Sequence, residues 1–314
     1  LLAAFPDRLA RLRAGSQDRG LLVGGRGVRI DGRSRVRGEP LFLAIDVDDG
    51  GGEVRARVVS GAGGVWPAGR PLRTTEELLY NPTRRQVEAR LRTYWIDLLI
   101  DETPAAIADW DAAAELLARH ARDELDRVLP AADSAAGQFW RRAAWVAAAT
   151  PELGWPALSR EAVAERLAEL CRGLRSIDEL RQADWLSWLQ RLTGVERVRE
   201  IDRLAPADVP LPSGNRGAIL YDWDQPPTLA VKIQELFGLA ETPRIAGGRH
   251  ALRLQLLGPN GRPQQVTTDL ASFWQNTYPQ VQKELRRRYP KHHWPDDPAS
   301  AAASRSGLKR HAGP

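Results

Sequence analysis

The residue types that could do chemistry gather between residues 244 and 294, where basic and aromatic side chains recur together. An arginine can hold a phosphate through two hydrogen bonds, and an aromatic ring can stack on an unpaired base for about 1–3 kcal/mol. The combination therefore predicts contacts with the backbone and bases of a single-stranded nucleic acid. The candidate residues are Arg244, Arg249, Arg262, Lys283, Arg286, Arg287, Arg288, Lys291, Trp274, Tyr289 and Trp294.

The predicted helix from Tyr278 to Tyr289 carries the densest part of this cluster. Lys283, Arg286 and Arg287 stand at i, i+3 and i+4, a spacing that places them on one helical face. A second interpretation is a solvated helix end, at which cations complement the negative end of the helix dipole. The sequence leaves both interpretations open.

Metal-binding chemistry has little support in the sequence. His292 and His293 with Asp296 and Asp297 form a ligand-like group, but adjacent histidines in an extended, proline-rich segment point to different sides. The acidic run at residues 46–50 lacks the regular alternation of a calcium-binding loop. We therefore predict no metal site.

The catalytic motifs of several large enzyme classes are absent from the sequence. It contains no phosphate-binding G-x-x-x-x-G-K-[ST] loop, no G-x-S-x-G elbow, no H-E-x-x-H pair and no G-x-G-x-x-G fingerprint. The single cysteine, Cys171, excludes an internal disulfide, and its helical surroundings favour a buried, inert thiol. No catalytic residue and no bound cofactor are predicted for this chain.

Charge is distributed unevenly along the 314 residues. Residues 1–105 hold 17 basic and 14 acidic side chains (+3), residues 106–210 hold 14 and 18 (−4), and residues 211–314 hold 14 and 8 (+6). A polyanion is therefore attracted most strongly to the last third. The acidic middle third is typical of a solvated helical block.

The cellular context follows from what the chain lacks. It has no apolar run of about 18 residues and no signal peptide, so we expect no membrane partner and a cytoplasmic location. It begins at Leu1 and contains no methionine, which favours a fragment of a longer polypeptide.

The periodicity of the chain predicts an α+β fold in three domains followed by a tail. Short apolar runs separated by glycine-rich turns predict an OB-like small β-barrel at residues 1–104, opened by the end of a helix at residues 1–13. Helical periodicity predicts a central helical block at 105–204, in which Ser159 caps a helix and Ser176 with Glu179 forms a capping box. The tryptophans of this block are expected to be packing anchors.

Helical and strand periodicity both recur in the predicted C-terminal α+β module at 205–298. It is expected to contain a strand at 216–221, a helix at 228–238, a hairpin turning at Asn260 and Gly261, and two further helices. We expect the first of these helices at 270–275 and the second to be capped by Thr277. The residues from 299 to 314 have no apolar period and are predicted to be a disordered tail.

Several long stretches resemble the C-terminal region of bacterial HrpB-type ATP-dependent helicases. They read AVKIQELFG from residue 230, TPRIAGGR from 242, GRPQQVT from 261, KELR from 283 and RYPKH from 288, followed by WPDDP from 294. FPDRLA from residue 5 and DVDDG from 46 resemble the same proteins, while the central helices show little similarity. Arg287 departs from the pattern, which often has a glycine there, and His293 is an addition.

The resemblance implies an accessory region of a DEAH-type RNA helicase. In that family, RecA-like motor domains upstream hydrolyse ATP with magnesium, and an OB-like barrel and a family-specific region follow them. The partners implied are RNA or another single-stranded nucleic acid and the motor domains of the same polypeptide. An alternative remains that the region is a protein-interaction or structural module that packs on the motor or on a partner without touching RNA.

Overall fold

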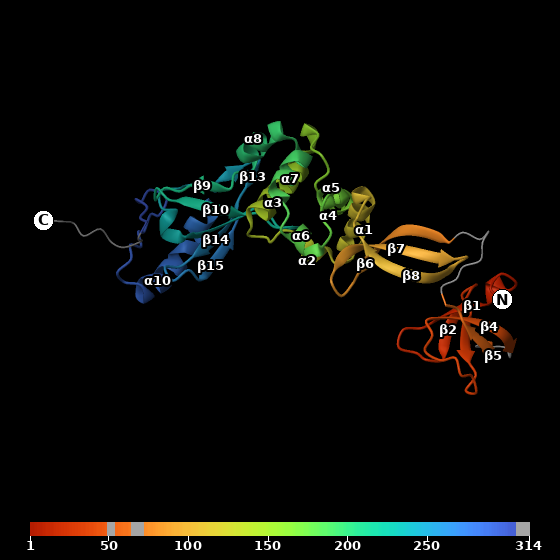
Figure 1. Ribbon diagram of the computed structural model, residues 1–314. Helices are drawn as coiled ribbons and strands as arrows, with labels where there is room; N and C mark the ends of the chain where they lie inside the picture. Colours follow the sequence, from red (N-terminus) through yellow and green to blue (C-terminus); the bar gives the residue numbers. More distant parts are fainter. Residues whose placement is uncertain (49–53, 64–71, 306–314) are drawn as a thin grey trace. The chain divides into compact units, whose positions relative to one another are not determined.

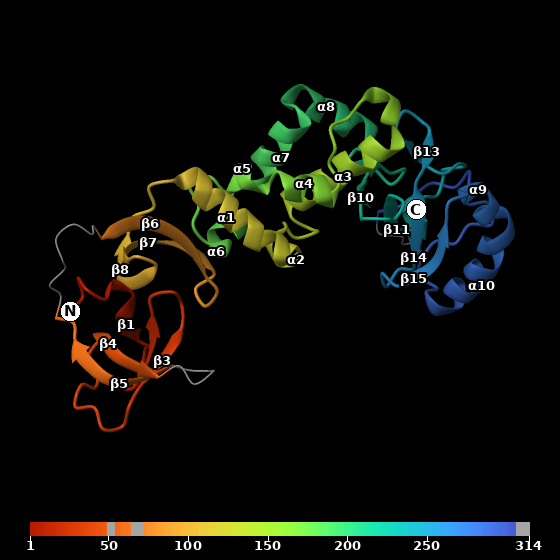
Figure 2. The same cartoon turned by 90° about the vertical axis from the view of Figure 1, so that its right-hand side faces the viewer.

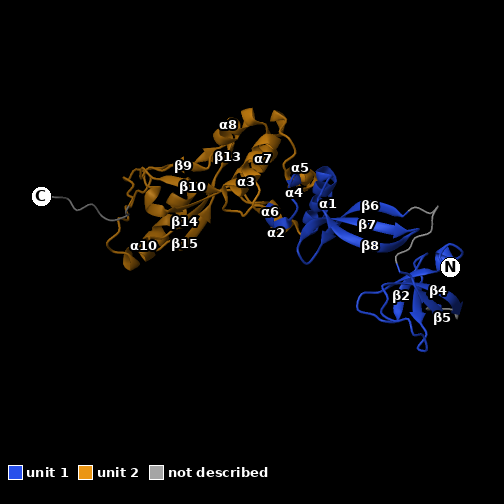
Figure 3. Ribbon diagram, in the orientation of Figure 1, with its two compact units in different colours: residues 1–123, 171–179 blue, residues 124–170, 180–314 orange. Residues whose placement is uncertain are grey.

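The computed structural model describes residues 1–48, 54–63 and 72–305, and the chain packs into two compact units (Figures 1 and 3). The first unit comprises Leu1–Asp123 and Cys171–Glu179, and the second comprises Glu124–Leu170 and Leu180–Pro314. The predicted α+β class is confirmed. The predicted division at residues 104, 204 and 298 stays a prediction. No helix of the described residues combines the length and apolar composition that a bilayer crossing requires.

The first unit begins with a closed five-stranded barrel, as predicted for an OB-like domain. Its strands follow the order β1-β2-β3-β5-β4, and β3 pairs with β5 in parallel while the other described pairs are antiparallel. Alternate residues such as Val28 and Ile30 point into the barrel and are buried. The strands are β1 (Leu9–Leu12), β2 (Arg19–Leu22), β3 (Gly27–Ile30), β4 (Leu41–Asp48) and β5 (Val54–Gly61).

The opening segment is not the helix end that the sequence suggested. After a 3₁₀ turn at Pro6–Arg8 the chain enters β1, because Leu9 and Ala10 are fully buried and β1 hydrogen-bonds to both β2 and β4. The indole Nε1 of Trp95 donates to the carbonyl oxygen of Pro6 at 2.8 Å. Closure of the barrel therefore requires this segment to be extended.

A separate three-stranded antiparallel sheet completes the first unit with one helix. Helix α1 (Trp110–Asp123) buries its alanine-rich face and lies in contact with β6 and β7. The segment 171–179 adds to the same sheet, since the amide of Ile177 donates to the Arg85 oxygen at 3.0 Å. The strands are β6 (Arg73–Asn81), β7 (Gln86–Trp95) and β8 (Leu98–Ala105), and the short helices α5 (Leu167–Cys171) and α6 (Ile177–Arg181) flank that segment in the sequence.

Side-chain caps start the helices of the second unit where polar residues precede them. Ser159 accepts a hydrogen bond from the Ala162 amide at 3.2 Å, which confirms the predicted cap. In the first unit, the predicted capping box is also present: the Glu179 amide donates to Ser176 Oγ at 3.1 Å, and the Ser176 amide donates to Glu179 Oε2 at 3.3 Å. The helices are α2 (Leu125–Val128), α3 (Ala135–Ala149), α4 (Arg160–Glu165), α7 (Trp185–Thr193) and α8 (Val195–Leu204).

A five-stranded mixed sheet forms the centre of the second unit, in the order β15-β14-β11-β10-β9. Strand β11 pairs in parallel with β14, and the other pairs are antiparallel. The predicted hairpin at Asn260 and Gly261 joins β14 to β15. The strands are β9 (Asp208–Pro210), β10 (Arg216–Leu220), β11 (Thr228–Lys232), β14 (Arg253–Leu257) and β15 (Pro263–Thr267), and β12 (Arg244–Ile245) with β13 (His250–Ala251) forms a separate hairpin.

One helix prediction in this unit is wrong, and two other predicted helices are present but without the break expected between them. The stretch 228–238 is strand β11 followed by a 3₁₀ turn at Ile233–Glu235, because Leu229 and Val231 alternate into the core beside β14. The helices expected at 270–275 and from Thr277 are continuous through a π-helical turn (α9, Leu270–Ser272; η4, Phe273–Thr277; α10, Tyr278–Arg288). Asp269 caps the whole element, since its carboxylate accepts from the Ser272 amide at 2.9 Å.

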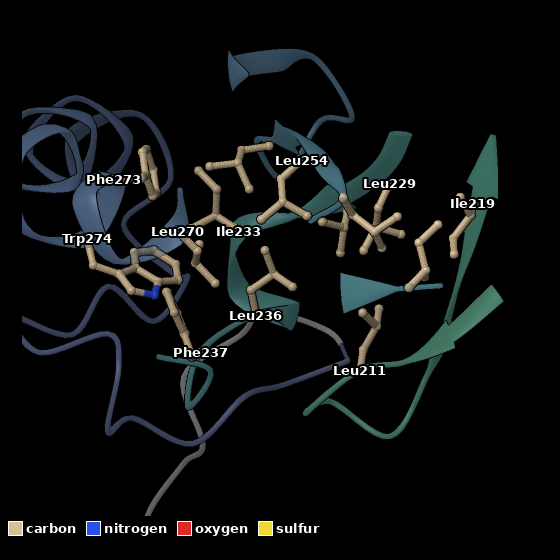
Figure 4. Close-up of a cluster of buried hydrophobic side chains, with 14 of the residues drawn as sticks. Leu211, Ile219, Leu229, Ile233, Leu236, Phe237, Leu254, Leu270, Phe273 and Trp274 are labelled. Atoms are coloured by element: carbon tan, nitrogen blue, oxygen red, sulfur yellow. The ribbon is translucent and has the colours of Figure 1, made fainter. Parts of the chain in front are cut away.

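A large buried cluster lies between this sheet and the C-terminal helices (Figure 4). Leucines from the strands meet Leu236 and Phe237 of the 3₁₀ region, which in turn contact Phe273 and Trp274. Ala299, Ala301 and Ala303 also pack on this cluster. Residues 299–305 are therefore held on the core, whereas the tail prediction for 306–314 falls outside the described residues.

Truncation of Leu254 should destabilise the second unit strongly, because its side chain is fully buried in the interior strand β14. We expect Leu254→Ala to lower the free energy of unfolding by about 2–5 kcal/mol. Leu220→Ala is the matched control, since Leu220 is 55% exposed on strand β10 of the same sheet. Leu220→Ala should change the free energy of unfolding by no more than about 0.5 kcal/mol. Urea unfolding monitored by circular dichroism measures both variants. Equal losses in the two variants would contradict this core.

Candidate nucleic-acid interface

Two of the predicted stacking residues belong to the core. Trp274 and Trp294 are only 6% and 3% exposed. The indole of Trp274 donates to the Leu239 oxygen at 2.8 Å, and that of Trp294 donates to the Tyr289 oxygen at 3.1 Å. A base could not reach either ring face without displacing the core. The stacking role expected for these two residues is therefore wrong, and packing is their structural role.

Tyr289 has an intermediate position at the end of α10. Its amide donates to the Leu285 oxygen at 2.7 Å, and its half-buried ring packs against the core cluster. The guanidinium of Arg288 lies 5.9 Å from the ring centroid, within the range of a cation–π contact. Of the three predicted aromatic residues, only Tyr289 retains a partly exposed ring.

The buried amide of Gln282 fastens the proline-rich segment after α10 to that helix. Its Nε2 lies 3.2 Å from the Trp294 oxygen, 2.8 Å from the Pro295 oxygen and 2.9 Å from Asp296 Oδ1. The Tyr278 hydroxyl adds a hydrogen bond to the Pro295 oxygen at 3.1 Å. These bonds fix residues 294–296 against the face of α10 that the helix buries.

Arg286 takes part in this internal network. Its Nη2 donates to the Trp294 oxygen at 2.5 Å and lies 3.3 Å from Asp296 Oδ1. The hydrogen bond from Gln282 and the positive charge of Arg286 lower the pKa of the Asp296 carboxyl below its ordinary value of 3.8. The guanidinium of Arg286 is therefore bonded within the chain and is less available to a ligand than the neighbouring cations.

The other cations of α10 and the following turn remain exposed. Among the described residues, no acidic side chain forms an ion pair with Lys283, Arg287 or Lys291. Lys283 and Arg287 stand at i and i+4 and so lie close together on the helix surface. Arg262 is exposed in the turn between β14 and β15. These positions can offer unpaired positive charge to a phosphate.

Arg244 and Arg249 belong to the β12–β13 hairpin and are engaged there. Arg244 Nε donates to the Gly248 oxygen at 2.6 Å, and its Nη2 donates to the Arg249 oxygen at 3.2 Å. Arg249 forms an ion pair with Glu152. Strand β13 lies apart from α10 in both Figure 1 and Figure 2. The structure therefore does not gather all the predicted basic residues into one patch.

The histidine pair of this region has no metal-binding geometry. Within the described ranges, no three His, Cys, Asp or Glu side chains are arranged to hold a metal ion. Burial, followed by the nearby positive charge of Lys232, lowers the pKa of His292. Asp296 is committed to Gln282 and Arg286. Of the acidic run at residues 46–50, residues 49 and 50 lie outside the described part.

The tryptophans predicted to be packing anchors divide into two groups. Trp140, Trp185 and Trp188 are buried, which confirms the prediction for them. Trp110 is 41% exposed, and Trp145 and Trp155 are half-buried along a groove. Helical spacing alone could not separate these groups, because buried and partly exposed tryptophans both occur on helices. The other predicted core residue, Cys171, is fully buried, and burial raises the pKa of its thiol to about 12.

Comparisons with known proteins agree with the sequence resemblance. A family model described as ATP-dependent helicase C-terminal, HrpB_C, matches residues 166–298. The ATP-dependent RNA helicase HrpB of Escherichia coli (strain K12) is 32% identical over 318 residues, which cover 98% of this chain and 39% of that protein. The chain thus spans about two fifths of the length of this curated relative.

Two crystal structures are also similar. The E. coli DExH-box NTPase HrpB has a TM-score of 0.60 at 31% identity, and the match covers 97% of this chain and 38% of that one. The Escherichia coli DEAH/RHA helicase HrpB has a TM-score of 0.52 at 30% identity, with 94% and 38% covered. Both matches extend over nearly all of the present chain.

Acid should weaken the contact between Asp296 and its partners. A carboxyl with a lowered pKa contributes stability above its ordinary pKa of 3.8 and loses that contribution as the pH falls through the folded-state value. We expect the difference in melting temperature between the wild type and Asp296→Asn to shrink as the pH falls below 3.8. Glu284→Gln, which removes an exposed acid from α10, is the control. A difference that stays constant with pH would contradict the linkage.

Proposed function

Because this chain belongs to the HrpB-type ATP-dependent helicases and corresponds to their C-terminal region, we propose that it grips single-stranded RNA for motor domains elsewhere in the polypeptide. The observation that carries the proposal is the set of exposed cations on α10 and the adjoining turns. Lys283, Arg287 and Lys291 have no acidic partner among the described residues, and the last third of the chain has a net charge of +6. Such a surface attracts a phosphate backbone.

The proposed mechanism is positional. Phosphate contacts hold a strand and fix its register without reading its sequence. The barrel of the first unit supplies a second group of arginines for the same purpose, since Arg33, Arg35 and Arg55 are exposed on it. ATP and magnesium belong, in this proposal, to the motor domains, because this sequence has no phosphate-binding lysine loop. We also propose that the protein acts in the cytoplasm.

A second candidate function is a protein-interaction module, and particular contacts favour it. Arg244, Arg249 and Arg286 use their guanidinium groups within the chain. Val195 and Leu220 are 69% and 55% exposed, so apolar surface is available to a packed partner. In this case the cations of α10 would be solvated, and binding to RNA would be weak.

Salt dependence of RNA binding separates the two functions. We expect a fluorescent oligouridylate to bind this chain with an affinity that falls linearly on a plot of log K against log salt. The double variant Lys283→Gln/Arg287→Gln should reduce the slope by about 1.4, or about 0.7 for each lost phosphate contact. Fluorescence anisotropy at four salt concentrations measures the slope.

Arg199→Gln/Arg203→Gln is the matched control. It also removes two exposed cations at i and i+4 from a helix of the second unit, but it does so on α8, where Glu200 pairs with Arg203 at 3.6 Å. The control should leave the slope close to that of the wild type. No binding at low salt, or equal losses in both double variants, would favour the interaction module instead.

A further inference from the structure

A groove in the second unit is lined by three half-buried tryptophans that come from separate segments. Trp145 lies on α3, Trp155 follows the 3₁₀ turn at Pro151–Leu153, and Trp223 lies in the loop between β10 and β11. The groove has a volume of about 710 Å³. Alanines and prolines make up half of the other lining residues. The lining is therefore mainly apolar, and its three indole side chains are partly exposed.

Each of the three rings contacts a residue that does not line the groove. The indole of Trp155 donates to Thr150 Oγ1 at 2.9 Å, Trp145 packs edge-on at 5.7 Å from Tyr221, and Trp223 packs edge-on at 4.9 Å from Trp140. No ring contact joins the three groove tryptophans to one another among the described residues. They form separate, preorganised platforms, as an extended ligand with repeated apolar groups requires.

Two of the rings keep a hydrogen-bond donor available. In the part of the chain that the structure describes, neither Trp145 Nε1 nor Trp223 Nε1 has a hydrogen-bond partner. By contrast, Trp140 donates to the Leu158 oxygen at 2.7 Å and Trp155 to Thr150. An indole N–H at an apolar surface favours a ligand that offers carbonyl oxygens close to apolar groups.

The groove leaves one exposed acidic side chain without an ion pair among the described residues. Arg141 lies 3.4 Å from Asp222 and covers the Trp223 ring at 5.5 Å, so its charge is already matched. Asp224 is exposed at the rim and has a φ of 57°, in the left-handed region. Arg197 lies 5.4 Å from the Trp155 ring centroid and donates to the Gly154 oxygen at 2.7 Å, so it offsets part of the negative charge of the groove. Among the described residues Asp224 forms no ion pair, so its carboxylate can attract a positive group of a ligand.

We propose that this groove binds a proline-rich peptide segment that carries a basic residue. A polyproline II helix has three residues per turn and no internal hydrogen bonds, so its prolines can lie on the aromatic rings while its carbonyl oxygens accept from the indoles. The basic residue pairs with Asp224. The segment belongs to another protein, and its recognition does not depend on the proposed grip on RNA.

Binding of a labelled peptide tests this assignment directly. The probes are a fluorescein-labelled peptide of ten prolines ending in arginine, the same peptide ending in glutamate, and a labelled ten-residue oligouridylate. We expect the arginine-ended peptide to bind the wild-type chain more tightly than the glutamate-ended one. Trp223→Ala should weaken it about tenfold, as expected for the loss of one aromatic platform.

Two further variants keep the result interpretable. Asp224→Asn preserves the side-chain shape and suits a positive φ, so it should remain folded and abolish the preference for arginine over glutamate. Trp110→Ala removes an exposed tryptophan outside the groove and should leave peptide binding unchanged. Circular dichroism checks that each variant is folded.

Three outcomes would overturn the proposal. The first is no peptide binding by the wild type up to about 1 mM. The second is peptide binding that Trp223→Ala and Asp224→Asn leave unchanged. The third is oligouridylate binding that Trp223→Ala abolishes, which would make the groove a base-stacking site.

Discussion

The parallel pairing of β11 with β14 determines the arrangement of the C-terminal half of the chain. Its register places Leu229 opposite Leu254 and Val231 opposite Leu256, and all four side chains are buried. Parallel strands cannot be joined by a tight turn, so the chain must cross the sheet before β14 begins. This crossover carries Phe237 into the core, where its ring lies 6.0 Å from Trp274 and 6.1 Å from Tyr278. The sheet therefore also anchors the C-terminal helices.

The basic residues of the C-terminal half have two different roles. Arg244, Arg249 and Arg286 bind backbone oxygens or carboxylates of the chain and so hold the hairpin and the 294–296 segment in place. Lys283 lies three residues before Arg286 and Arg287 directly follows it, yet the charge of both remains unmatched in the described part of the chain. A count of basic residues cannot distinguish structural from available charge, because the difference depends on which acceptors the fold brings nearby.

Local features of the chain were predictable, and features set by distant partners were not. The cap at Ser159 and the box of Ser176 with Glu179 depend on residues within one helical turn, so the sequence alone reveals them. The run 228–238 contains apolar residues compatible with either period, and only its partner β14 makes it a strand.

The candidate site shows the same limit. Basic residues on α10 were predictable from helical spacing, and their exposure is consistent with that pattern. The burial of Trp274 and Trp294 was not, because an aromatic side chain has the same identity in a core and on a binding surface. The groove around Trp145 and Trp223 was also missed, since its walls come from segments far apart in the sequence.

The position of Cys171 gives this protein an internal chemical reporter. The chain leaves the first unit at Asp123 and re-enters it at Cys171, so this residue begins the returning segment. Its thiol is fully buried, and a pKa of about 12 keeps it protonated at neutral pH. Alkylation requires an accessible thiolate, so the thiol does not react in the native state until the structure around it opens. As the sequence has a single cysteine, the rate of modification measures the opening of this one segment without an added label.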